Sequence, residues 1–131
     1  MNHMTASLKE VAAAFTEDGR LDQDEVGKLA QRFFHDAKID RDEADTAFEI
    51  NDRVSKSQKN APTWPSLFAA VVTAYVLEDG RLDDGEASYL QGKISADGSV
   101  DNAERTLLQA ILTSGAPVPA SFRTWAEGAV K

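Results

Sequence analysis

One short pattern occurs four times in this chain, and its spacing constrains the fold more than any other feature of the sequence. The pattern is an Asp, a small residue, any residue, an aliphatic residue, a second Asp, two further residues and a Glu. Its copies span residues 18–25, 36–43, 79–86 and 97–104, so copies within a half are 18 residues apart and the two halves are offset by 61 residues. At that offset, residues 17–22 and 78–83 are identical. We therefore predict a tandem duplication, with repeats at about residues 5–57 and 66–118.

The segments between the turns have the spacing of amphipathic helices. Apolar residues recur at intervals of three and four, for example at Leu8, Val11 and Phe15. No segment alternates with the period of two that is typical of a strand. Pro65 suits the first turn of one helix, and Pro119 suits the start of the last. We predict an all-α fold, a seven-helix bundle that forms a single domain over residues 1–131. Two duplicated helix–turn–helix units, with three helices in the first half and four in the second, are joined by a linker at about residues 56–64.

The charge of the chain narrows the classes of partner. Lys and Arg number 14 against 22 Asp and Glu, so the formal net charge is −8, which disfavours nucleic-acid phosphates and anionic membrane surfaces. The longest apolar run, at about residues 67–77, is far shorter than the roughly 20 residues that cross a bilayer. The N-terminus has no basic segment followed by an apolar run, and there is no cysteine. We expect a cytoplasmic protein that binds no nucleic acid and does not insert into a membrane.

The repeated turn is explained in full as a junction between two helices. Its glycines, Gly19, Gly80 and Gly98, can adopt the left-handed conformation that follows a helix. Its second Asp can cap the next helix, and the Glu three residues later then completes a capping box. The aliphatic residue before each cap is placed to pack against the new helix as a hydrophobic staple. We favour this interpretation, which needs no ligand.

The turn also matches the second half of a calcium-binding EF-hand loop, and a metal site is therefore the alternative. All four copies lack the carboxylate that such a loop needs at its first position, so a working EF-hand is excluded. Carboxylates from two turns that meet in space could still hold calcium or another divalent cation. The candidate ligands, which are helix caps in the favoured interpretation, are Asp18, Asp22, Glu25, Asp79, Asp83, Glu86, Asp97, Asp101 and Glu104.

Groups suited to catalysis are scarce in this sequence. Cysteine nucleophiles are absent, and the two histidines are His3, near the N-terminus, and His35, beside Asp36. No serine has a histidine and an acid placed to form a triad. The glycines are isolated in turns and do not form a phosphate-binding loop. We therefore predict that the protein is not an enzyme and needs no organic cofactor.

Three copies of the turn resemble the helix-joining turn of the TerB-like superfamily, which is named for a tellurite-resistance protein. The resemblance is carried by residues 78–83 with Glu86, residues 96–101 with Glu104, and residues 18–22 with Glu25, and it covers most of residues 8–113. It implies a seven-helix bundle with pseudo-twofold symmetry, a link to stress response and an acidic metal-binding patch. Ala37 replaces the glycine of this turn, so the second copy departs from the family pattern.

The sequence is compatible with two functions of different classes. The first is a non-catalytic TerB-like module that binds another protein in a stress-related role, with weak binding of divalent cations. The alternative is a small acidic inhibitor or immunity-type protein that blocks a basic nuclease or effector. Because opposite charges steer association, both functions predict a protein partner with a basic surface.

Overall fold

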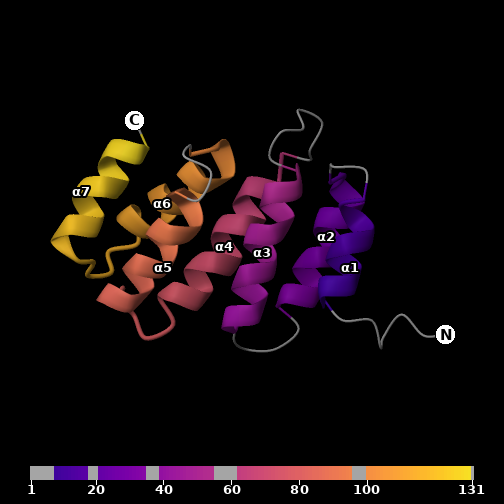
Figure 1. Ribbon diagram of the computed structural model, residues 1–131. Coiled ribbons are helices and arrows are strands. Elements are labelled where there is room, and N and C mark those ends of the chain that lie inside the picture. Colours follow the sequence, from indigo (N-terminus) through magenta and orange to yellow (C-terminus); the bar gives the residue numbers. More distant parts are fainter. Residues whose placement is uncertain (1–7, 18–20, 35–38, 55–61, 96–99, 131) are drawn as a thin grey trace.

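Seven α-helices make up the computed structural model, which describes residues 8–17, 21–34, 39–54, 62–95 and 100–130. Within these ranges there is no strand (Figure 1). The helices are α1 (Leu8–Phe15), α2 (Gln23–Phe33), α3 (Arg41–Val54), α4 (Trp64–Val76), α5 (Asp84–Ser95), α6 (Asn102–Thr113) and α7 (Ala120–Ala129). The predicted all-α class is confirmed for the described residues, as are the three helices of the first half and the four of the second.

The helix starts recur at the spacing of the repeated turn. Helices α2 and α5 begin 61 residues apart, and so do α3 and α6. The first helices of the two halves differ, because α4 begins at Trp64, five residues before the position that corresponds to Leu8. Pro65 lies in the first turn of α4, as predicted, where the missing N–H of proline costs no hydrogen bond. The spacing agrees with a duplication, which stays a prediction.

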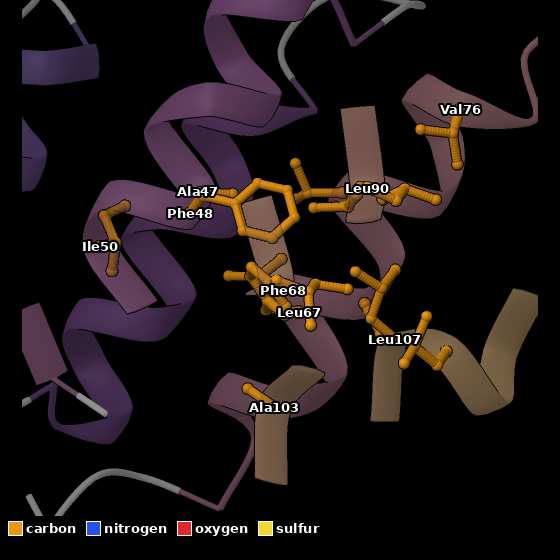
Figure 2. Close-up of a cluster of buried hydrophobic side chains, with 14 of the residues drawn as sticks. Ala47, Phe48, Ile50, Leu67, Phe68, Val76, Leu90, Ala103 and Leu107 are labelled. Carbon is orange, nitrogen blue, oxygen red and sulfur yellow. The ribbon is translucent and has the colours of Figure 1, made fainter. Parts of the chain in front are cut away.

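Helix α4 lies at the centre of the core. It packs against α6, α3 and α2, and none of its 13 residues is charged. Apolar side chains are needed around most of its circumference because neighbours cover it on several sides. Figure 2 shows Phe68 of α4 among buried side chains that include Phe48 and Leu107. The Phe68 ring lies edge-on to that of Phe48, with the ring centroids 5.1 Å apart.

The apolar character of α4 reflects this burial in the bundle. At 13 residues the helix is well below the length of about 20 residues that spans a bilayer. Across the ranges that the structure describes, no helix has both the length and the apolar character needed to cross a membrane.

A buried polar chain links three of the helices. Trp64, at the start of α4, donates its Nε1–H to Oδ1 of Asn51 in α3 at 3.1 Å. Asn51 donates an Nδ2–H to Oδ2 of Asp101, just before α6, at 2.9 Å. Trp64 is 2% exposed and Asn51 is 3% exposed. Since these groups are shielded from water, the two bonds fix α3, α4 and α6 relative to one another.

Helix α7 closes the end of the molecule opposite α1 (Figure 1). It begins at Ala120, directly after Pro119, which confirms the predicted start of the last helix. Its buried Phe122 and half-buried Trp125 have ring centroids 5.7 Å apart. The helix packs on α6 through this face.

Candidate functional site

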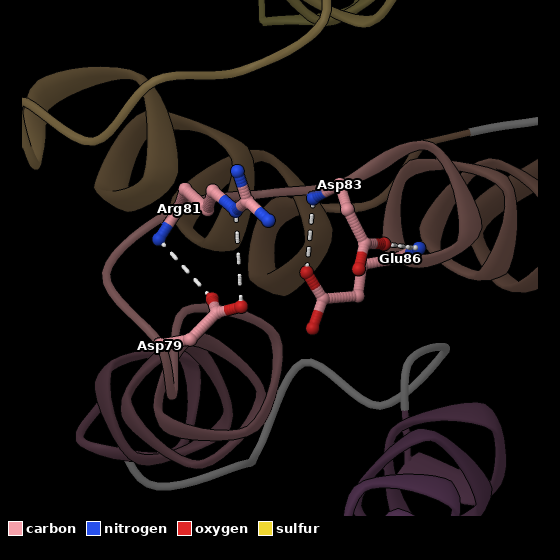
Figure 3. A network of polar contacts seen from close by, with 4 residues as sticks. All are labelled: Asp79, Arg81, Asp83 and Glu86. Carbon is pink, nitrogen blue, oxygen red and sulfur yellow. Dashed lines mark hydrogen bonds and ion pairs between the residues drawn. The ribbon is translucent and has the colours of Figure 1, made fainter.

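The turn between α4 and α5 is the one copy of the repeated pattern that the structure describes from end to end. Gly80 has a φ of 86°, which is the predicted left-handed conformation, and its N–H donates to the carbonyl of Leu77 at 2.9 Å. Asp79 accepts the backbone N–H of Arg81 at 3.3 Å, and its other oxygen lies 3.9 Å from the Arg81 Nε (Figure 3). The other two predicted left-handed glycines, Gly19 and Gly98, lie outside the described residues.

All four copies of the turn form the predicted capping box. In each, the second Asp accepts the backbone N–H of the Glu, and the Glu accepts the backbone N–H of the Asp, at distances between 2.7 and 3.1 Å. The aliphatic residue before each cap is buried or half-buried; these residues are Leu21, Ile39, Leu82 and Val100. The helix-junction interpretation is therefore confirmed for the second half of each turn.

Loss of a cap is expected to lower stability by a measurable amount. Asp22→Ala and Asp83→Ala each remove an oxygen that accepts a first-turn N–H, which costs about 0.5–2 kcal/mol of unfolding free energy. Asp24→Ala, in the same turn of α2, is the control, because no cap bond depends on that exposed side chain. Urea denaturation measures the three midpoints, and unchanged midpoints for both cap variants would contradict the assignment.

The candidate metal ligands lie in pairs in the described part of the chain. Six of them form capping boxes, and Asp79 lies beside Arg81. Among the described residues, no group of three or more His, Asp or Glu side chains is arranged to hold a metal ion. Asp18 and Asp97 lie outside the described residues. A cation site that includes those two residues therefore stays a prediction.

The electrostatics of the α4–α5 turn are dominated by negative charge. Residues 78–86 contain five carboxylates and one arginine. Burial raises the pKa of Glu86 above its ordinary value, and the negative charges of Asp83, Asp79 and Glu78 raise it further, while the hydrogen bond from the Asp83 backbone lowers it. On balance the pKa of Glu86 is raised. The turn is thus a place where additional positive charge would be favourable.

The raised pKa of Glu86 predicts a pH-dependent effect of the substitution Glu86→Gln. The amide oxygen of Gln can still accept the Asp83 N–H, but the charge is gone. Because the folded-state pKa is raised, the folded protein binds this proton more tightly than the unfolded chain does, so ionised Glu86 opposes folding. We expect Glu86→Gln to be more stable than the wild type near neutral pH. The difference should shrink as the pH falls from the folded-state pKa to the ordinary one.

Urea denaturation across this pH range measures that difference. Glu25→Gln, at the equivalent capping position of α2, is the control for removing a charge from a capping box. A difference between Glu86→Gln and wild type that is the same at every pH would show that the charge of Glu86 does not oppose folding.

A hollow of about 370 Å³ adjoins the turn. Residues 81–84 line one side of it, and residues 117–119 of the α6–α7 connection line the other. The two segments are joined by a hydrogen bond from the Leu82 N–H to the Pro117 carbonyl at 2.9 Å. The exposed carboxylate of Asp84 thus stands beside an apolar wall of two prolines and Val118.

Sequence reasoning missed a second polar cluster, which links α3 to α5. The Tyr89 hydroxyl donates to Oδ1 of Asp45 at 2.7 Å, and the Lys93 Nζ lies 3.4 Å from the same oxygen. The guanidinium of Arg41 lies over the Tyr89 ring, 4.9 Å from its centroid. Burial raises the pKa of Tyr89, and the hydrogen bond to Asp45 and its charge raise it further, so the phenol remains a donor. No short-range pattern marks this cluster, because 44 residues separate Tyr89 from Asp45.

Comparisons of the chain with protein-family models, with curated proteins and with solved structures find no match. The resemblance to the TerB-like superfamily therefore stays a prediction, supported by the residues of the turn.

Proposed function

We propose that the protein is a non-catalytic, TerB-like interaction module whose α4–α5 turn binds a basic surface of another protein. The observation that carries the proposal is the balance of five carboxylates and one arginine over residues 78–86. Four of these carboxylate side chains, those of Glu78, Asp79, Asp83 and Asp84, belong to exposed residues. The negative charges of Asp83, Asp79 and Glu78 contribute to the raised pKa of Glu86. Lysines or arginines of a partner would relieve the repulsion among these carboxylates.

The sequence adds a further argument for non-catalytic binding. With no cysteine and two histidines in 131 residues, the chain has few groups that could serve as an activated nucleophile or its base. The carboxylates of the repeated turn serve as helix caps. The proposed stress-related role and weak binding of divalent cations rest on the TerB-like resemblance.

The net charge of −8 also favours a second candidate, a small acidic inhibitor or immunity-type protein that blocks a basic nuclease or effector. Its basic partner would meet the same turn. The identity of the partner separates the two candidates, and affinity capture from the native host followed by mass spectrometry identifies it.

The proposal predicts how association depends on salt. Exposed charge pairs mainly speed the encounter, and salt screens them over a Debye length of about 8–10 Å at physiological strength. We expect the association rate with the captured partner to fall by about tenfold or more between low and physiological salt, while the dissociation rate changes less. Surface plasmon resonance measures both rates. An association rate that is indifferent to salt would contradict recognition through acidic charge.

A further inference from the structure

A shallow apolar groove runs between α4 and α6 and is separate from the acidic turn. Its volume is about 540 Å³. Its lining is made of small side chains without charge, among them Ser66, Ala70, Thr73 and Ala74 of α4 and Thr106 and Ala110 of α6. Small side chains let another helix approach closely, so large apolar side chains of that helix could enter the groove.

The exposed face of α4 indicates that the groove is a contact surface. Ser66, Ala70 and Ala74 are exposed and spaced four residues apart, so they form one face of a helix that carries no charge in any of its 13 residues. A helix that is uncharged all round is typical of one that is covered on all sides.

The direction of the groove relates it to the acidic turn. Ala74 lies four residues before Glu78, where the acidic turn begins. The groove therefore leads from an uncharged wall to a group of carboxylates at the C-terminal end of α4. The helix macrodipole is also negative at that end. An apolar surface that ends in negative charge complements a segment with an apolar face and basic residues at one end.

We propose that the α4–α6 groove binds an amphipathic helix of the partner protein, with its large apolar side chains in the groove and its basic end at the α4–α5 turn. This inference rests on the proposed function, since it assumes a basic partner. A second copy of this chain fits less well. Two copies would each bring a net charge of −8 and a turn with five carboxylates to the same contact.

The test uses a synthetic, fluorescein-labelled peptide of about five helical turns. It has leucines along one face and lysines in its last turn; a scrambled peptide has the same composition and no apolar face. Fluorescence anisotropy measures their affinities for the full chain. We expect the amphipathic peptide to bind at least about tenfold more tightly than the scrambled one.

Matched protein variants locate the binding site of the peptide. Ala70→Arg places a long charged side chain in the groove, and Ala13→Arg makes the same change at an exposed position of α1. Both positions are exposed on helices, and melting curves establish that both variants fold. We expect Ala70→Arg to lower the affinity for the amphipathic peptide by about tenfold or more. Ala13→Arg should change this affinity by less than about twofold.

Three outcomes would overturn the inference, and they separate it from the proposed function. Equal effects of Ala70→Arg and Ala13→Arg, with binding still weakened by salt, would exclude the groove and leave the acidic turn as the docking site. Peptide affinity that Ala70→Arg lowers but that does not change with salt would exclude a role for the basic end of the partner helix. That result would contradict the proposed function itself. A wild-type dimer that Ala70→Arg dissociates in sedimentation equilibrium would make a second copy the occupant.

Discussion

The substitution Phe68→Ala is expected to lower the free energy of unfolding by about 3–5 kcal/mol. Phe68 is fully buried in α4, and its ring meets Phe48 and Trp64 at centroid distances of 5.1 and 5.9 Å. Alanine would remove these contacts and leave a cavity in the closely packed core.

Phe34→Ala is the matched control, because Phe34 is 46% exposed just after α2. Its loss should change stability by no more than about 0.5 kcal/mol. Urea denaturation of both variants tests the position of the core. A similar cost for the two substitutions would contradict the placement of α4 at its centre.

The substitution Asn51→Ala is expected to cost about 2–4 kcal/mol, although asparagine contributes little apolar area. Its loss would leave two groups without their partner: the buried Nε1–H of Trp64 and the Oδ2 oxygen of Asp101. Leaving a buried polar group unpaired costs more than a typical hydrogen bond contributes. Asn102→Ala, at an exposed position in the first turn of α6, is the control and should be close to neutral.

The substitution Asn51→Asp tests the same network by charge. It keeps an acceptor for Trp64 but places a second carboxylate at the 2.9 Å contact with Asp101. Two facing carboxylates raise the pKa of the pair, so the folded variant holds a proton that the unfolded chain releases. The stability of Asn51→Asp relative to wild type should therefore rise as the pH falls. Relative stability that does not change with pH would show that the two side chains do not meet.

The helix ends could be predicted because the interactions that set them are local. Each capping box joins an Asp to a Glu three residues later, as in Asp83 and Glu86, and both are visible in one short stretch of sequence. The helical class followed equally from apolar spacing, which repeats every three to four residues. Local reasoning reaches its limit at the start of α4. Pro65 marks the first turn of this helix in the sequence, but the side chain of Trp64 is held by Asn51 of another helix.

The two polar clusters and the groove were harder to predict, because distance along the chain hides their parts. Asn51 and Asp101 are 50 residues apart, and Tyr89 and Asp45 are 44 residues apart. The groove between α4 and α6 is equally hidden, since its two walls come from different helices and consist of small residues that carry no signal of their own. In the α4–α5 turn, Asp79, Asp83 and Glu86 were candidates beforehand, because they belong to the repeated pattern.

The most direct test of the proposed function compares two variants with the same net charge. One neutralises the acidic turn, with Glu78→Gln, Asp79→Asn and Asp84→Asn. The other neutralises three exposed acids of α3 and α7, with Glu49→Gln, Asp52→Asn and Glu127→Gln. Surface plasmon resonance at low salt measures the association rate of each with the captured partner. We expect the turn variant to associate about tenfold more slowly than wild type and the control to stay within about threefold. Equal rates for the two variants would contradict recognition through the α4–α5 turn.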